Sequence, residues 1–173
     1  MLLSYIEICE LIERNIISGA KYENVNSSSL DITLGSTILR ENTGTSISLQ
    51  NKESLHMEKE HLPYALIPGE FVLASSKEVF NLPNMISAEY KLKSSMARIG
   101  LEHLNAGWCD AGWHGSVLTL ELKNMTRFHH LLLSEGDKIG QIVFFRHTEV
   151  PADKSYAVRG RYNNDLQAQG AKR

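Results

Sequence analysis

The sequence is poor in cysteine and has no long apolar run. Cys9 and Cys109 are the only thiols among 173 residues, and neither belongs to a paired spacing such as CxxC. This argues against a disulfide framework and against a cysteine-based zinc site, and it fits a reducing compartment. No stretch approaches the about 20 apolar residues that a membrane helix needs. Because two glutamates lie among the first ten residues, we expect no signal peptide and a cytoplasmic protein.

An excess of positive charge is also absent. The formal net charge is -2, whereas domains that bind long nucleic acid by bulk electrostatics carry a strong basic excess. We therefore expect no membrane or long nucleic acid as a partner, and any bound anion should be small. The hydrophobic share of 42% and the charged share of 22% are those of an ordinary globular protein. The length fits a single domain over 1–173 with its own core.

One helix is expected near the start of the chain. Ser4 and Glu7 have the spacing of a capping box. Apolar residues then recur at helical spacing, at Ile8, Leu11, Ile12 and Ile16. With Gly19 as a stop signal, the pattern predicts a helix from Tyr5 to Ile17.

The rest of the chain is typical of a mainly β protein. Short segments rich in Val, Ile, Leu, Phe and Thr are separated by turn signals: SLDITLG, STILRE, YALIPGEFVLASS, SVLTLELKN and GQIVFF. They predict a sandwich or barrel of mainly antiparallel strands, with residues 43–59 as a loop or weak hairpin. The tail, residues 152–173, is polar and has few large aliphatic residues. It should be disordered unless a bound molecule orders it.

The segment SVLTLELKN places a glutamate opposite a row of leucines. At a period of two, Leu118, Leu120 and Leu122 share one face of the predicted strand. Glu121 therefore points away from the core, into solvent or into a cavity. A plain surface glutamate near Lys123 and a functional carboxylate are both open at this point.

The preceding segment, AGWCDAGWHG, holds three glycines and two tryptophans in ten residues. It predicts a tight loop whose backbone comes close to something flat or small. Asp110 in its middle either bonds its own backbone, as aspartates in turns do, or accepts a hydrogen bond from a hydroxyl or water.

Two further clusters could carry chemistry. His103, Cys109 and His114 are suitable zinc ligands, but they lie at intervals of six and five with no fourth candidate, so we expect no metal site. The Pro-Cys-x-x-Cys element of the zinc deaminases is absent. The stretch KSSMARIGL, residues 93–101, sets two hydroxyls between a lysine and an arginine. It is either a capped turn leading into a short helix or a cradle for an anion.

The order of these segments resembles the dCTP deaminase and dUTPase superfamily, and within it the dCTP deaminase branch. The segments are SSSLDITLG, PGEFVLASSKE, KSSMARIGL, AGWCDAGWHGSVLTLELKN, GDKIGQIVFF and RGRYNNDLQAQG. The resemblance covers nearly the whole chain, and SSMARIGL and DAGWHG followed by LELKN are its most specific parts. It implies a distorted jelly roll of antiparallel strands, assembled as a homotrimer whose active sites are shared between subunits.

The resemblance also implies an enzyme that hydrolyses a C–N bond of a cyclic amidine without a metal. It would convert dCTP to dUTP and ammonia and so supply uracil nucleotides for thymidylate synthesis. Glu121 matches the family's general base and proton shuttle. Arg98 would keep Glu121 ionised and oriented. Ser94 and a backbone carbonyl at Ala106 or Gly107 would position the water.

Other matched positions would bind the nucleotide. Ser95 would donate to phosphate, and Lys93 stands where the family more often has arginine, so the charge is kept without the bidentate fork. Asp110 matches an aspartate that lies against the 3'-hydroxyl and that activates water in the dUTPases. Mg²⁺ would arrive on the triphosphate, without zinc. The tail would close over the nucleotide through Tyr156, Arg159, Arg161 and either Gln167 or Gln169.

The chain departs from the family pattern in two places. The segment between Arg98 and Asp110 is one residue short, and the segment between Gly115 and Glu121 is one residue long. The extra residue, near Ser116 or Val117, could be absorbed as a bulge that re-aims the strand, or it could alter the base pocket. Two other functions stay open: a dUTP diphosphatase or a bifunctional enzyme that carries out both steps, and a nucleotide-binding or regulatory protein of the same fold without catalysis.

Overall fold

A computed structural model describes residues 1–51 and 53–172, and its first element is a short helix, α1 (Tyr5–Glu13). The predicted capping box is present, because the Glu7 carboxylate accepts the Ser4 N–H at 3.0 Å. The prediction that the helix runs to Ile17 is wrong. Asn15 adopts a left-handed φ of 55°, and Ile17 already belongs to a strand that pairs with Phe80.

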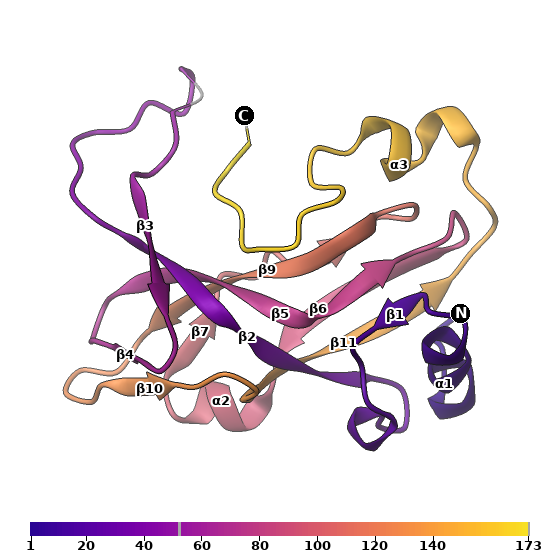
Figure 1. The fold of residues 1–173 in the computed structure, drawn as a ribbon, viewed down its shortest axis with the longest axis horizontal. Coiled ribbons are helices and arrows are strands. Elements are labelled where there is room, and N and C mark those ends of the chain that lie inside the picture. Colours follow the sequence, from indigo (N-terminus) through magenta and orange to yellow (C-terminus); the bar gives the residue numbers. More distant parts are fainter. Residues whose placement is uncertain (52, 173) are drawn as a thin grey trace.

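Antiparallel strands make up most of the regular secondary structure (Figure 1). Nine of them form one sheet whose main path runs β7-β9-β5-β2-β11-β6-β8, with β1 beside β5 and β3 beside β2. The bounds are β1 (Ile17–Ser18), β2 (Leu30–Glu41), β3 (Met57–His61), β5 (Phe71–Asn81), β6 (Ile86–Leu92), β7 (Leu101–His103), β8 (Trp108–Cys109), β9 (His114–Asn124) and β11 (Lys138–Arg146). A second, two-stranded sheet pairs β4 (Tyr64–Leu66) with β10 (Leu131–Leu133). The mainly β expectation is confirmed.

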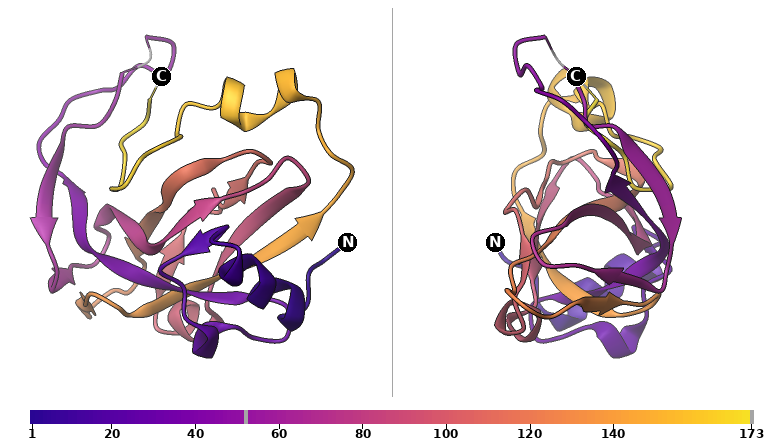
Figure 2. Two further views of the ribbon diagram at one scale, coloured as in Figure 1. Left: turned by 45° about the vertical axis from the view of Figure 1, so that its right-hand side comes forward. Right: turned by 90° about the vertical axis from the view of Figure 1, so that its left-hand side faces the viewer.

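The large sheet curls into a half-barrel around the apolar core (Figure 2). Leu118, Leu120 and Leu122 of β9 are at most 6% exposed, so the predicted buried face of this strand is confirmed. Burying a leucine side chain contributes about 1.5–3 kcal/mol. Three such residues in one short strand fix which face of β9 is turned inward.

The remaining elements are short: η1 (Tyr22–Asn24), α2 (Ser94–Arg98), η2 (Ala152–Lys154) and α3 (Tyr156–Arg159). None of the described helices is long and apolar enough to cross a membrane. Within the predicted loop of 43–59, residues 57–59 form the start of β3, which pairs with the end of β2. Lys52 in that loop and Arg173 at the end of the predicted tail lie outside the described residues.

Candidate functional site

A cavity of about 690 Å³ opens beside β9, under the C-terminal tail. This volume lies within the range of small-molecule sites, about 300–1,000 Å³. Residues from β5, β6, β7, β8, β9, the loop before β3, and the tail line it. Its polar lining includes Glu53, Ser54, Tyr90, His103, Asp110, Thr119, Glu121, Tyr156, Tyr162, Asp165 and Gln169.

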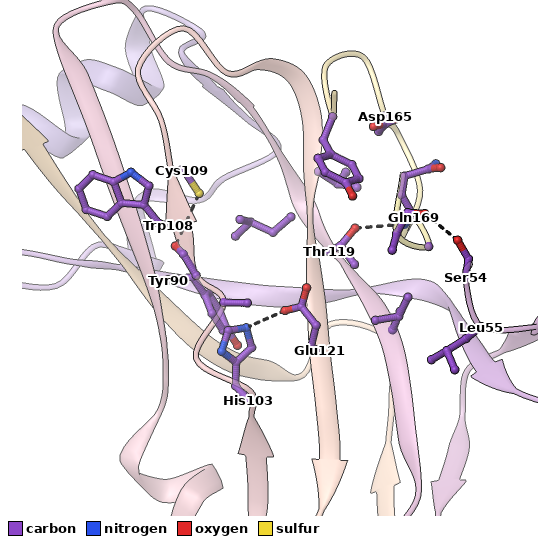
Figure 3. Close-up of a pocket in the computed structure, with 18 of the residues that line it drawn as sticks. Ser54, Leu55, Tyr90, His103, Trp108, Cys109, Thr119, Glu121, Asp165 and Gln169 are labelled. Atoms are coloured by element: carbon purple, nitrogen blue, oxygen red, sulfur yellow. Dashed lines mark hydrogen bonds and ion pairs between the residues drawn. The ribbon is translucent and has the colours of Figure 1, made fainter. Parts of the chain in front are cut away.

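Glu121 faces this cavity from β9 (Figure 3). Its neighbours along the strand, Leu120 and Leu122, are fully buried, so the alternation of the strand turns the carboxylate to the other face. The side chain is 25% exposed. Of the two environments left open by the sequence, the structure therefore places Glu121 in the cavity wall.

His103, the last residue of β7, lies beside Glu121. The distance from its Nε2 to Glu121 Oε2 is 3.3 Å, and its ring packs on Tyr90 with centroids 4.5 Å apart. The two atoms are within ion-pair distance but are not aligned for a hydrogen bond, and neither has a hydrogen-bond partner among the described residues. The sequence pointed to His103 only as a metal candidate, because nothing in it shows that β7 lies next to β9.

Asp110 is exposed at the edge of the cavity and is held by a tryptophan. The indole Nε1 of Trp108 donates to Asp110 Oδ1 at 2.9 Å. The Asp110 side chain thus has a side-chain partner, which the sequence did not indicate. Cys109 lies between Trp108 and Asp110 in the sequence. Burial, followed by the charges of Asp110 and Glu121, raises the pKa of its thiol to about 12. Cys109 therefore stays protonated near neutral pH and is a poor nucleophile.

The C-terminal tail lies along β9 and closes one side of the cavity (Figure 2). The Val117 N–H donates to the Asp165 carbonyl at 2.9 Å, and the Gln169 N–H donates to Thr119 Oγ1 at 3.1 Å. Tyr156 and Gln169 line the cavity, and their contact with a nucleotide stays a prediction. That the tail opens and closes over a nucleotide stays a prediction.

Gln167 and the two tail arginines point elsewhere in this conformation. Gln167 Oε1 accepts from Lys59 at 3.1 Å, and Arg161 Nη1 donates to the Lys172 carbonyl at 3.0 Å. Arg159 lines a smaller cavity of about 380 Å³, to which Asp110 also contributes.

Two glycines at the start of β9, Gly112 just before the strand and Gly115 within it, make room for the tail. A Cβ on Gly115, where φ is +65°, would lie 2.4 Å from Asn164 Oδ1. At Gly112, where φ is +87°, it would lie 2.0 Å from Ser155 Oγ. At these two positions the expected close approach is therefore to the tail. Relative to β5, β9 holds one extra residue between His114 and Ser116, which is where we expected a bulge.

The residues of α2 are not brought to this cavity within one chain. Ser94, Ser95 and Arg98 are exposed, and α2 lies at the end of the sheet opposite the tail (Figure 1). Lys93 Nζ contacts Asp31 Oδ1 at 2.6 Å. Burial alone would raise the pKa of Asp31, but the hydrogen bonds from Lys93 and Asn26 hold it below its usual value.

Comparison with known proteins shows the family to which the chain belongs. A sequence model described as dCTP deaminase-like matches residues 2–147. The chain belongs to the dCTP deaminase-like family. The expected enzyme class, a hydrolase acting on C–N bonds, is confirmed by relatives named as dCTP deaminases.

Relatives named "dCTP deaminase, dUMP-forming" correct one expectation. The protein of that name from Methanosphaerula palustris is 36% identical over 177 residues, covering 97% of this chain and 93% of its own length. Its namesake from Aquifex aeolicus is 35% identical, covering 94% of this chain and 89% of its own length. The expectation that dUTP is the released product is wrong for these relatives, because their names state dUMP.

Solved structures share the fold. The dCTP deaminase from Agrobacterium tumefaciens superposes with a TM-score of 0.67 at 23% identity, over 83% of this chain and 48% of that one. This chain thus spans about half the length of that protein. The dUTPase from Streptococcus mutans superposes with a TM-score of 0.52 at 16% identity, over 77% of this chain and 88% of the other. The dUTPase-like fold expected from the sequence is confirmed.

Proposed function

We propose that this protein is a dUMP-forming dCTP deaminase. It consumes dCTP and two water molecules and releases ammonia, diphosphate and dUMP. The observation that carries this proposal is the Glu121 carboxylate, turned into a cavity large enough for a nucleotide. Relatives of similar length that carry this name support it.

Glu121 acts as the base in the first step. It takes a proton from water as the oxygen attacks C4 of cytosine and gives that proton to the ring nitrogen N3. It then takes the proton of the new C4 hydroxyl and gives it to the amine, so that C4=O forms as the C4–N bond breaks and ammonia leaves. The Gly107 carbonyl already accepts the Tyr90 N–H at 2.8 Å, which favours the Ala106 carbonyl as the acceptor that holds this water.

Asp110 serves the second step. Its carboxylate lies at the cavity edge, oriented by Trp108, and would activate the water that cleaves the phosphate chain between the α- and β-phosphorus atoms. Tyr156 and Gln169 of the tail cover the nucleotide and exclude water from the reacting groups. Arg159 and Arg161 would turn toward the phosphates when substrate binds.

Mg²⁺ would arrive with the triphosphate. Asp110 offers a carboxylate in the cavity lining, which fits this ion because Mg²⁺ prefers oxygen ligands while keeping several waters. When bound it neutralises phosphate charge. Both carboxylate oxygens of Asp165 accept from Lys172 Nζ. This contact, at 2.6 Å for Oδ2, positions the carboxylate at the tail.

A homotrimer with shared sites would complete the cavity. The family roles of Lys93, Ser94, Ser95 and Arg98 require them near Glu121, yet one chain holds α2 and the tail at opposite ends of the sheet (Figure 1). A neighbouring copy can bring α2 to the cavity, because cyclic assemblies place different surface patches of successive copies in contact. A cytoplasmic location fits the two free cysteines, Cys9 and Cys109.

Product analysis tests this function. Purified protein is incubated with dCTP and Mg²⁺, and ammonia and nucleotides are quantified over time, with dUTP as a parallel substrate. We expect ammonia and dUMP in equal amounts, and dUMP from dUTP. If dUTP is cleaved while dCTP is untouched, the protein is a dUTP diphosphatase. If neither substrate changes although dCTP binds, the non-catalytic alternative replaces the proposal.

A further inference from the structure

We infer that His103 is a positioning residue for the deamination step, acting through its contact with Glu121. The inference rests on the proposed function and adds a second residue to the machinery around C4. His103 touches neither substrate nor water in this role. It holds one oxygen of Glu121 so that the other faces the cavity.

The contact lies in a buried environment. His103 is 5% exposed, and its ring is held between the end of β7 and Tyr90, which is 3% exposed. A ring packed in this way has little freedom to rotate, so its Nε2 stays near Glu121 Oε2, 3.3 Å away, although the two atoms are not aligned for a hydrogen bond in this conformation (Figure 3).

Unpartnered polar atoms gather at this place. Among the described residues, four buried side-chain polar atoms have no hydrogen-bond partner, and three of them are Tyr90 OH, His103 Nε2 and Glu121 Oε2. Buried polar groups are nearly always paired, so such a cluster indicates a site whose contacts are completed during function. Hydrogen bonds in sites without substrate are often loose and tighten in the reacting complex.

The neighbours of Glu121 limit what the proton can do. Burial, followed by the charge of Glu121, raises the pKa of the Tyr90 hydroxyl. The pKa of the Cys109 thiol is also raised, mainly by burial. Both stay protonated near neutral pH and do not accept the proton that Glu121 takes from water. Neither group therefore competes with Glu121 as the base, and His103 contributes through its position beside the carboxylate.

Two substitutions separate positioning from packing. His103→Gln keeps a side-chain N–H able to reach Glu121, whereas His103→Leu fills the site without a donor. We expect His103→Leu to lower kcat for ammonia release from dCTP about 100-fold, the effect of a misplaced reacting group. KM should stay near the wild-type value, and His103→Gln should recover most of the lost kcat. The exposed His130→Leu serves as the matched control.

Cleavage of dUTP by the same variants is measured in parallel, because that step does not use Glu121. Unchanged dUTP hydrolysis by His103→Leu shows that the fold and the assembly are intact. The inference is overturned if His103→Leu releases ammonia as fast as an active wild type, or if both variants lose both reactions equally. An inactive wild type overturns the proposed function itself.

Discussion

At the scale of single residues, the site holds two carboxylates in different surroundings. Glu121 lies between two fully buried leucines on β9, and its partly exposed side chain faces the cavity. Asp110 is exposed and bonded to an indole N–H. Enzymes separate acid and base roles by placing titratable groups in contrasting environments. The two positions therefore suit two successive reactions on one nucleotide.

Replacing Asp110 with asparagine tests this division. The amide keeps the shape and an acceptor for Trp108 but cannot take a proton from water. We expect the dUTP cleavage rate to fall by at least about 100-fold, while ammonia release continues and dUTP accumulates from dCTP. Chromatography of the products measures both steps. Asp153→Asn, an exposed carboxylate paired with Lys154, is the control, and continued dUMP formation by Asp110→Asn would rule out this role.

At the scale of elements, the tail and β9 form one unit. Backbone groups of the tail pair with β9, as in the Val117 N–H bond to the Asp165 carbonyl, and Trp113 Nε1 donates to the Tyr162 carbonyl at 2.8 Å. Gly115 leaves space for Asn164. These contacts hold the C-terminal tail over the cavity without a large apolar interface.

Gly115→Ala should weaken the docking of the C-terminal tail on β9. The new Cβ would clash with Asn164, and φ is +65° there, so docking should weaken by on the order of 1 kcal/mol or more. We expect faster trypsin cleavage after Arg159 and Arg161 and a higher KM for dCTP. Gly44→Ala, where none of the described residues lies within 4 Å of the added Cβ, should behave as wild type. Equal cleavage rates for the two variants would show that Gly115 does not control the tail.

The sequence predicted those parts of the structure that depend on local patterns. The leucine alternation identified the inward face of β9 and so the direction of Glu121. The predicted end of α1 was wrong, because Asn15 adopts a left-handed backbone conformation and Ile17 pairs with Phe80 in the sheet. The sequence could not show His103 beside Glu121, since that contact needs β7 placed against β9. Closure by the tail was expected only through the resemblance, because the tail docks mainly through its own backbone atoms, such as the Asp165 and Tyr162 carbonyls, which no side-chain pattern reveals.

At the scale of the whole molecule, the residues of one reaction are distributed over distant parts of the fold. Glu121, Asp110 and the tail share a cavity, while Ser94 and Arg98 lie on the exposed α2 at the other end. The resemblance placed all of them in one site. One chain does not bring these residues together, so the proposed activity would depend on the proposed association of copies.

Mixing two inactive variants tests this dependence. If Glu121 and Arg98 of one site come from different copies, co-assembly of Glu121→Gln with Arg98→Ala should regenerate intact sites. With random mixing of equal amounts, about a quarter of the sites would hold both native residues. Deamination should thus recover to about a quarter of the wild-type rate. An inactive mixture, with mixed assembly confirmed by differently tagged chains, would place both residues in the same chain's site.

The most direct test of the account is the dCTP deamination rate of Glu121→Gln. The amide is the same size and keeps an acceptor toward His103, but it cannot take the proton from water. We predict that ammonia release falls by about 10²–10⁴-fold, while dCTP binding by calorimetry and dUTP cleavage persist. Ammonia release at the wild-type rate would contradict the account and remove Glu121 from the chemistry.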